Sequence, residues 1–182
     1  RLICASNANN VLTEFLRTLF DNMRPLAQQK GISMEMAVEG TPRAKTYYDC
    51  DKMDKIVYNL LSNAIKYTRD GGSVRLGVAY QPAGQVAISV SDNGIGMDKE
   101  DLENNLGVIA SSGSYKFKQE VGDDAKDTDV IGQFGVGFYS AFMVADHITV
   151  VTKKYGSDTA YMWQSAGADG YTITECEKDA VG

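Results

Sequence analysis

The chain has 182 residues, a formal net charge of −6 and 43% apolar residues. This length fits a single domain, and the composition is that of an ordinary globular protein. No apolar run reaches the length of a membrane span, and no basic patch suits a nucleic-acid backbone. The sequence therefore predicts neither membrane insertion nor a nucleic-acid partner.

The first half of the chain predicts two helices and four strands. Apolar residues at helical spacing predict an amphipathic helix over 11–30 and a second over 51–67, with Asp51 as its N-cap. Alternating apolar and polar residues predict strands over 32–38, 46–49, 74–78 and 86–90, the last two as a hairpin. The predicted buried face of the second helix consists of Met53, Ile56, Val57, Leu60, Leu61, Ala64 and Ile65.

The second half predicts helices over 98–110 and 138–144 and strands over 148–152, 160–164 and 171–175. Between these helices, residues 111–129 are polar and charged, with few apolar anchors. Such a stretch fits a mobile lid or a plain surface loop equally well, and we assign a lid to about 98–130. The whole predicts one α/β (α+β) domain, a two-layer sandwich of a mixed, mostly antiparallel sheet with helices on one face.

Three cysteines, Cys4, Cys50 and Cys176, lie far apart and form no C-x-x-C pair. This spacing predicts unpaired thiols in a reducing compartment, and neither a disulfide framework nor a zinc site. With no apolar leader at the start, we expect a cytoplasmic domain. Because neither end resembles a natural terminus, we expect this domain to be part of a longer protein.

The predicted second helix carries Asn59, Asn63 and Lys66 at spacing i, i+4 and i+7, so they share one stripe. A carboxamide oxygen suits a partly hydrated magnesium ion, and a lysine suits a phosphate. Taken alone, a solvated polar face is the simpler explanation of this stripe.

A carboxylate followed by two glycines comes directly after the predicted hairpin, in Asp92-Asn93-Gly94-Ile95-Gly96-Met97. The glycines let the backbone approach a ligand, and Asp92 would accept a hydrogen bond from an adenine amino group. Guanine presents a carbonyl there, which a carboxylate repels. The alternative is an ordinary turn with an Asx hydrogen bond.

A glycine-rich segment, Gly132-Gln133-Phe134-Gly135-Val136-Gly137, leads into the helix predicted near Phe138. Glycines free backbone N–H groups to point at an anion, and a helix N-terminus adds its dipole. The pattern is not the dinucleotide fingerprint and follows a polar loop instead of a first strand, so it argues against a Rossmann fold. A glycine-rich hinge is the alternative.

Together the three motifs resemble the GHKL superfamily of gyrase-type ATPases, heat-shock chaperones, histidine kinases and mismatch-repair ATPases, which implies a Bergerat-type ATP-binding fold. Residues 1 to about 96 resemble the catalytic ATP-binding domain of a bacterial sensor histidine kinase, above all in the decapeptide 59–68. Residues from about 94 to 182 resemble the N-terminal ATPase domain of the ninety-kilodalton heat-shock chaperones, above all in 131–145. We therefore predict a single domain, 1–182, that is a chimera of halves 1–96 and 97–182.

The resemblance implies ATP or ADP with Mg²⁺ as ligands and assigns Asn63 to the metal. It implies that the chaperones' general-base glutamate is replaced by Asn59, and the kinases' phospho-accepting histidine is absent, since the one histidine, His147, opens a predicted strand. The remaining nucleotide contacts that it implies, beside Asn59 and Lys66, are Asp92, Gly94, Gly96, Met97, Asn105, Leu106, Gly132, Gly135, Val136, Gly137 and Phe138.

The sequence thus predicts a domain that binds Mg-ATP or ADP and turns it over weakly or not at all; its protein partner is unknown. One alternative is an active ATPase or kinase fragment, which needs a base or an acceptor that the sequence does not supply. Another is a polypeptide that only folds, with a pocket too disturbed to bind nucleotide.

Overall fold

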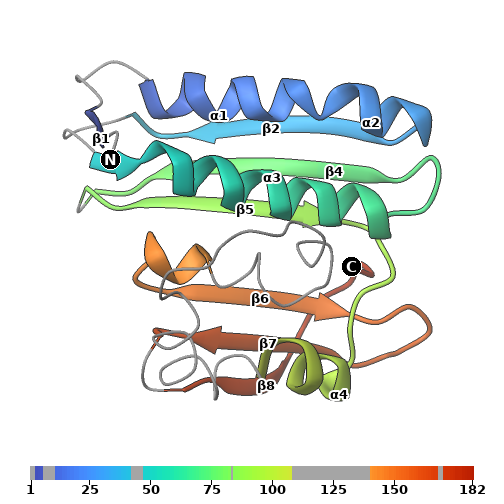
Figure 1. Cartoon of the computed structure of the whole chain (residues 1–182). Coiled ribbons are helices and arrows are strands. Elements are labelled where there is room, and N and C mark those ends of the chain that lie inside the picture. The colour runs from blue at the N-terminus through green and yellow to red at the C-terminus, as the bar shows by residue number, and fades with distance from the viewer. Residues whose placement is uncertain (1–2, 6–10, 42–46, 83, 108–139, 168–169) are drawn as a thin grey trace, which may run out of the picture. The chain divides into compact units, whose positions relative to one another are not determined.

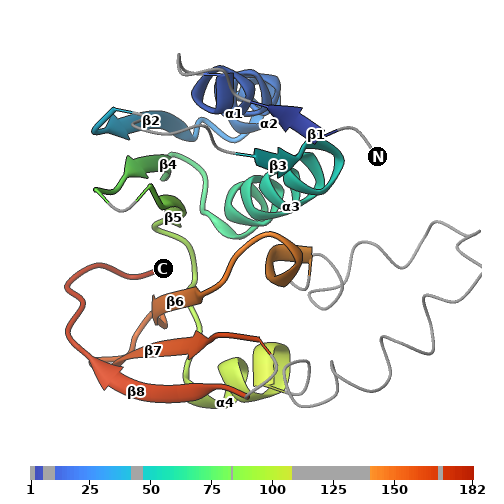
Figure 2. The same cartoon turned by 90° about the vertical axis from the view of Figure 1, so that its left-hand side faces the viewer.

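The computed structural model describes residues 3–5, 11–41, 47–82, 84–107, 140–167 and 170–182. These residues fall into two compact units, Arg1–Ile95 and Gly96–Gly182. Figures 1 and 2 show the elements of each unit from two directions. The α/β class with mixed strand directions is confirmed, and the strands within these described ranges form three sheets, ordered β1-β3, β2-β4-β5 and β6-β7-β8.

The Arg1–Ile95 unit packs helices on one face of a three-stranded sheet. Its helices are α1 (Val11–Asn22), α2 (Arg24–Gln29) and α3 (Cys50–Tyr67). Its sheet joins β2 (Ser33–Glu39) to β4 (Ser73–Tyr80) in parallel, and β4 to β5 (Val86–Asp92) antiparallel. A separate antiparallel pair joins β1 (Ile3–Ala5) to β3 (Tyr47–Asp49). The parallel pair is possible because α3 lies in the crossover between β2 and β4.

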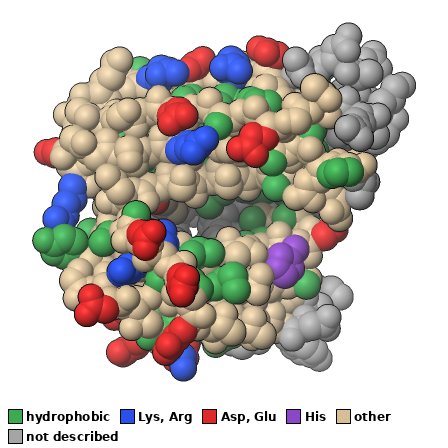
Figure 3. Space-filling model, turned by 180° about the vertical axis from the view of Figure 1, so that it is seen from behind, with side chains coloured by type: hydrophobic (Ala, Val, Ile, Leu, Met, Phe, Trp, Pro, Cys, Tyr) green, Lys and Arg blue, Asp and Glu red, His purple; other side chains and the backbone are tan. Residues whose placement is uncertain are grey.

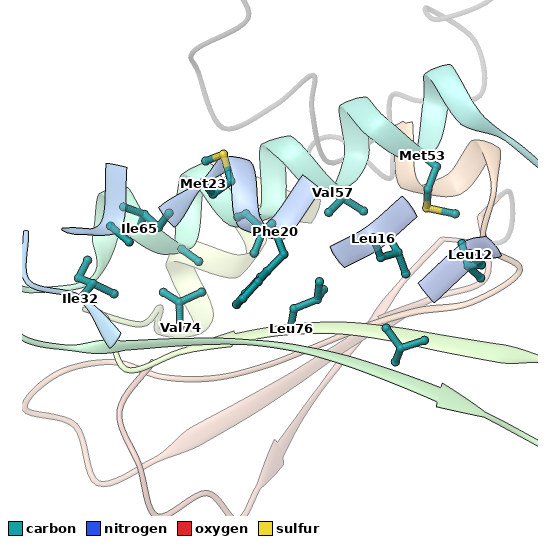
Figure 4. Packing of buried hydrophobic residues seen from close by; sticks show 14 of the residues in the cluster. Leu12, Leu16, Phe20, Met23, Ile32, Met53, Val57, Ile65, Val74 and Leu76 are labelled. Carbon is teal, nitrogen blue, oxygen red and sulfur yellow. The ribbon is translucent and has the colours of Figure 1, made fainter. Parts of the chain in front are cut away.

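Apolar side chains from both layers fill the space between helices and sheet (Figure 4). Leu16 from α1, Val57 from α3 and Leu76 from β4 are each fully buried. Each such side chain stabilises the fold by about 1.5–3 kcal/mol relative to exposure. The predicted buried face of α3 is confirmed except at Leu60, which is only half-buried.

Two helix predictions in this unit are wrong. The helix predicted over 11–30 is divided at Met23, because Pro25 has no N–H and cannot continue the ladder of hydrogen bonds. Asp51 is not the N-cap of α3. Asp49 holds that position and its Oδ1 accepts from the Lys52 N–H at 3.2 Å, whereas Asp51 lies in the first turn.

The cysteine prediction is also wrong at Cys50, which is disulfide-bonded, whereas Cys176 is free. Sequence separation conceals such a bond, since the pairing of β1 with β3 brings the N-terminal strand beside the residues that precede Cys50. The inference of a reducing compartment loses its basis, and the cytoplasmic location stays a prediction. No helix in the described ranges is both long and apolar enough to cross a bilayer.

The Gly96–Gly182 unit is built on an antiparallel meander of β6 (Ile148–Lys153), β7 (Ala160–Ser165) and β8 (Thr172–Cys176). Trp163, the chain's one tryptophan, is fully buried and stacks on Tyr171 with ring centroids 5.9 Å apart. Within the described residues 98–107, the helix predicted over 98–110 consists of α4 (Lys99–Leu102), which continues as a π-type turn, η1 (Glu103–Gly107). The helix predicted over 138–144 is a short 3₁₀ turn, η2 (Ser140–Met143), within the described residues.

Acidic and basic side chains are interspersed on the face of the molecule shown in Figure 3. His147 is exposed, and its Nε2 lies 3.4 Å from Nε2 of Gln164. The described residues contain no group of three or more His, Cys, Asp or Glu that could hold a metal ion.

Candidate functional site

Helix α3 carries the polar stripe predicted from the sequence. Asn59 and Asn63 are half-buried, and Lys66 is exposed in the last turn. All three lie outside the fully buried face, so their side chains border the core without entering it. The Lys66 ammonium lies 5.1 Å from the centre of the Tyr67 ring, a distance at which cation and ring attract each other.

Asp92 is the last residue of β5, and its carboxylate organises the turn that follows. Its Oδ1 accepts a hydrogen bond from the Gly94 N–H at 2.8 Å. This is the Asx turn that the sequence analysis left open as the alternative. The two readings are compatible, because a carboxylate has two oxygens and about four acceptor positions.

Gly94 is buried between this turn and the end of α3. A Cβ placed on Gly94 would lie 2.6 Å from Asp92 Oδ1 and 2.7 Å from the Tyr67 carbonyl oxygen. The Asn93 side chain joins the same turn to β4, since its Oδ1 accepts a hydrogen bond from the N–H of Ser73, the first residue of β4, at 2.8 Å. Only glycine fits where the backbone approaches this closely, which explains the first glycine of the D-x-G-x-G motif.

The carbonyls at the end of α3 meet a side chain that the sequence analysis did not assign to the site. The Lys30 ammonium donates to the carbonyl oxygens of Ile65 and Lys66, at 2.9 Å and 3.1 Å, and to that of Thr68. Spacing gives no signal for these contacts, because Lys30 lies 35 or more residues before its partners.

The Thr68 hydroxyl is a second feature that the sequence did not reveal. Thr68 is 1% exposed, and its Oγ1 has no hydrogen-bond partner among the described residues. Its methyl group lies beside Gly72, where an added Cβ would approach Cγ2 to 2.4 Å. Composition alone cannot distinguish this hydroxyl from the exposed threonines of the chain.

Gly96 opens the second unit and lies directly on the backbone of β6. Its φ of +63° is in the left-handed region, and an added Cβ would lie 2.0 Å from the Lys153 carbonyl oxygen. The next residue, Met97, donates its backbone N–H to the buried Thr152 Oγ1 at 2.8 Å. The second glycine of the motif is therefore required by conformation as well as by space.

A cluster of three charges follows at the start of α4. Asp98 and Asp101 form a reciprocal capping box, and Lys154 Nζ lies 2.6 Å and 2.8 Å from their Oδ2 atoms. The hydrogen bond from Lys154 is the main reason why the pKa of Asp98 is lowered. The hydrogen bonds to Asp101 and Asp98 raise the pKa of Lys154 in turn.

Asn105 and Leu106 lie in the π-type turn η1. Asn105 is half-buried, whereas Leu106 is 2% exposed and packs in the core with Leu102 and Trp163. In this structure Leu106 has a packing role, and contact with a nucleotide stays a prediction for both residues.

The glycine-rich candidates Gly132, Gly135, Val136, Gly137 and Phe138 lie outside the described residues, as does most of the predicted lid. The described candidates form two groups. Arg1–Ile95 holds Asn59, Asn63, Lys66, Asp92 and Gly94, and Gly96–Gly182 holds Gly96, Met97, Asn105 and Leu106.

In this α/β domain the helix with the asparagine stripe ends beside the D-x-G turn. Fold and turn agree with the class of ATP-binding domain that the sequence predicts. A family model described as "Histidine kinase-, DNA gyrase B-, and HSP90-like ATPase" matches residues 51–176. The chain belongs to this ATPase family, and its resemblance to the GHKL superfamily is confirmed.

Similar curated proteins include HtpG chaperones. HtpG of Clostridium botulinum strain Loch Maree is 52% identical over 134 residues, and HtpG of Bacillus subtilis is 51% identical over 134 residues. Each alignment covers 72% of this chain and 21% of the chaperone. The chain thus spans about a fifth of the length of these relatives.

Similar solved structures include histidine kinases. The nucleotide-free catalytic domain of ThkA has a TM-score of 0.58 at 14% identity and covers 92% of this chain and 97% of its own. The mycobacterial kinase MprB has a TM-score of 0.57 at 13% identity, covering 96% and 95%. Full-length ShkA in complex with AMPPNP has a TM-score of 0.58 at 18% identity, covering 94% and 32%. These TM-scores show a shared fold, and at such low identities the similarity shows the fold alone.

Neither comparison divides the chain at the predicted seam. An alignment of 134 residues is longer than the segment 97–182, so the similarity to HtpG extends into the first half. The structural similarity to histidine kinases likewise extends over both halves.

Proposed function

We propose that this chain binds Mg-ATP or ADP in the manner of its family and hydrolyses ATP weakly or not at all. The observation that carries the proposal is the turn at Asp92, whose carboxylate is oriented by the Gly94 N–H beside the last turn of α3. The family match supports it, as does the similar fold of ShkA, which has been crystallised with AMPPNP.

Asp92 provides the selectivity for adenine. A carboxylate accepts a hydrogen bond from the exocyclic amino group of adenine, and the Asx turn holds it in one orientation before the ligand arrives. Guanine would place a carbonyl oxygen against the same carboxylate, and two acceptors without a shared proton repel each other. Gly94, Gly96 and Met97 are nucleotide contacts that the family resemblance implies.

The stripe on α3 provides the phosphate and metal contacts. Asn63 offers one neutral oxygen, and the described residues supply no acidic cluster, so a magnesium ion would take its other ligands from water and phosphate. The residues fit a metal of this kind, whose chemistry is to neutralise the phosphate charge. Lys66, exposed at the end of α3, would meet a phosphate as a point charge.

The first test is a titration of the chain with ATP and with GTP, beside Asp92→Asn. A charge-assisted hydrogen bond contributes about 1.5–3 kcal/mol, so the substitution should lower ATP affinity about tenfold or more. Asp70→Asn, in the exposed turn after α3, is the matched control and should bind normally. Equal affinity of the unaltered chain for ATP and GTP would refute adenine selectivity, and no binding would favour a polypeptide that only folds.

The second test separates the metal role of Asn63 from a structural one. Asn63→Ala should weaken ATP binding in magnesium and have little effect in EDTA, where the metal bridge is already absent. An equal loss in both conditions would show that Asn63 supports the fold instead.

The third test concerns turnover. Asn59 can orient a water molecule but cannot take its proton near neutral pH, and general-base assistance contributes typically about 10²–10⁴-fold. Phosphate release should therefore be near background in the unaltered chain and rise in Asn59→Glu. Robust turnover without the substitution would favour the alternative of an active ATPase with another base.

We further propose that the chain joins a histidine-kinase-like half, 1–96, to a chaperone-like half, 97–182. Support comes from the two sets of motifs and from the division of the chain into units at Ile95 and Gly96. The reach of the HtpG similarity into the first half counts against a sharp seam. A chaperone segment would also bring the general-base glutamate that the resemblance implies, so the exchange of 1–96 for the corresponding segment of Bacillus subtilis HtpG is compared with Asn59→Glu. Turnover above that of Asn59→Glu would support a mismatch between the halves, and equal turnover would argue against one.

A further inference from the structure

The end of α3 exposes carbonyl oxygens that the helix itself cannot satisfy. The Ala64 carbonyl accepts from the Thr68 N–H at 3.0 Å at the cap of the helix, and the carbonyls that follow it take their partners from outside the helix. These carbonyls also form the negative end of the helix dipole. A side chain that donates hydrogen bonds to these carbonyls therefore helps to fix the position of the last turn of α3.

Lys30 contacts three carbonyls at this helix end. Its ammonium has three N–H donors, and they are matched by the oxygens of Ile65, Lys66 and Thr68. The Lys30 backbone is fixed to the same region, because its carbonyl accepts from the Gly71 N–H at 2.9 Å. Side chain and backbone of one residue thus hold both the helix end and the turn that follows it.

The Tyr67 carbonyl, which follows that of Lys66, lies beside Gly94. A Cβ added to Gly94 would come within 2.7 Å of its oxygen. The Gly94 N–H in turn orients the carboxylate of Asp92 at 2.8 Å. A shift of the last turn of α3 would therefore move the Tyr67 carbonyl against Gly94 and disturb the Asx turn. The path from Lys30 to Asp92 runs through contacts within Arg1–Ile95.

We propose that Lys30 is a positioning residue for the nucleotide site: by holding the Ile65, Lys66 and Thr68 carbonyls, it sets the last turn of α3 against Gly94 and so fixes the orientation of Asp92. This inference rests on the proposed binding of adenine nucleotide. It assigns to Lys30 no contact with the nucleotide.

The test compares Lys30→Met, which keeps the length of the side chain without its donors, with Lys30→Arg, which keeps the charge and several donors. Lys55→Met removes an exposed lysine from the same helix α3 and is the matched control. Amide NMR spectra of the nucleotide-free protein report on Gly94 directly. ATP affinity is measured at a temperature at which circular dichroism shows each variant to be fully folded.

Lys30→Met should displace the Gly94 amide signal, accelerate exchange of the Gly71 amide and lower ATP affinity roughly threefold to tenfold, as expected for loss of an indirect support. Lys30→Arg should largely reverse all three changes, and Lys55→Met should show none of them. If Lys30→Met fails to fold, Lys30→Gln, which keeps a neutral donor, takes its place in the same measurements.

A folded Lys30→Met protein with an unchanged Gly94 signal would overturn the proposal. A displaced Gly94 signal with unchanged ATP affinity would also overturn it, because the turn would then not govern binding. If the unaltered chain binds no ATP, the proposed function fails, and the Gly94 signal alone shows whether Lys30 positions the turn.

Discussion

Each unit has a lysine that contacts one end of a helix next to the D-x-G-x-G segment. The two lysines contact different helices and have different partners. Lys30 donates to three backbone carbonyls at the C-terminal end of α3, where its own side chain is half-buried. Lys154 contacts the carboxylates of Asp98 and Asp101 at the N-terminal end of α4, with side-chain exposures of 42%, 38% and 37%. We call these contacts the Lys30 junction and the Lys154 junction. Carbonyls do not titrate, whereas carboxylates do, so the two junctions should respond differently to substitution, salt and acid.

The largest fall in the free energy of unfolding should come from a substitution at Gly96, two residues before Asp98 of the Lys154 junction. Gly96→Ala combines a left-handed φ, costing about 1–2 kcal/mol, with an overlap against the Lys153 carbonyl that costs about 1–3 kcal/mol more. Gly156→Ala is the control, because its φ is +81° with nothing within 4 Å of an added Cβ. Urea unfolding followed by Trp163 fluorescence should show a clearly greater loss for Gly96→Ala. Equal losses would mean that the close approach is relieved at no cost.

Lys30→Met should rank second. Hydrogen bonds to a charged group contribute about 1.5–3 kcal/mol, and the substitution removes three such bonds from one ammonium that remains partly exposed. We expect the free energy of unfolding, measured by far-UV circular dichroism in urea, to fall by about 1.5–3 kcal/mol in total. A loss below that of Lys154→Met would reverse the comparison between the two junctions.

Thr152→Val should have a smaller effect. It keeps the shape of a buried side chain but removes the acceptor for the Met97 N–H, which costs about 1 kcal/mol. Thr174→Val, on the exposed face of β8, is the control and should change the free energy of unfolding by less than about 0.5 kcal/mol. A similar effect of the two substitutions would show that water replaces the lost acceptor.

The smallest effect, and the sharpest distinction between the junctions, should be the response to acid. The pKa of Asp98 is lowered in the folded state, so its contribution is present above the ordinary aspartate pKa of about 4 and is lost as pH falls further. The pKa of Lys154 is raised, so its contribution is lost only in strong alkali.

The melting temperature of Lys154→Met should therefore fall less between pH 7 and pH 3 than that of the unaltered chain. Lys30→Met should keep the full acid sensitivity, because its partners are carbonyls. High salt should reduce the difference at Lys154, because its side chain is partly exposed to solvent. Equal acid sensitivity of all three proteins would show that the exposed ion pairs contribute nothing measurable.

Much of the fold was predictable because its signals are local. The periodicity that ends at Tyr67 correctly predicts the end of α3, and alternation predicts each strand of the two three-stranded sheets. The break at Met23 was readable from Pro25, and Asp49 and Asp51 are both acceptable caps that only geometry distinguishes. The parallel pairing of β2 with β4 and the disulfide at Cys50 depend on which segments meet in space, and short-range patterns carry no record of that.

In the candidate site, too, the residues of local motifs were predictable from the sequence and the long-range contacts were not. Asp92 and Gly94 follow from one short motif, and the structure gives a physical reason for that glycine. Lys30, Thr152 and Lys154 contact residues far along the chain, and the Thr68 Oγ1 has no hydrogen-bond partner among the described residues. No local pattern could reveal these features. The nucleotide contacts implied by resemblance stay predictions, and those in 132–138 lie outside the described residues.

The parallel register of β2 and β4 has a consequence for the order of assembly. The pair Ser33 and Ser73 can form only after the chain between them, including α3, has closed into a loop, whereas β6, β7 and β8 join neighbours in sequence through short turns. Closing a long loop costs entropy before its contacts reward it, so short-range meanders form faster. In refolding experiments the Trp163 environment should therefore become native before the layer of α1, α3 and the β2-β4-β5 sheet is complete.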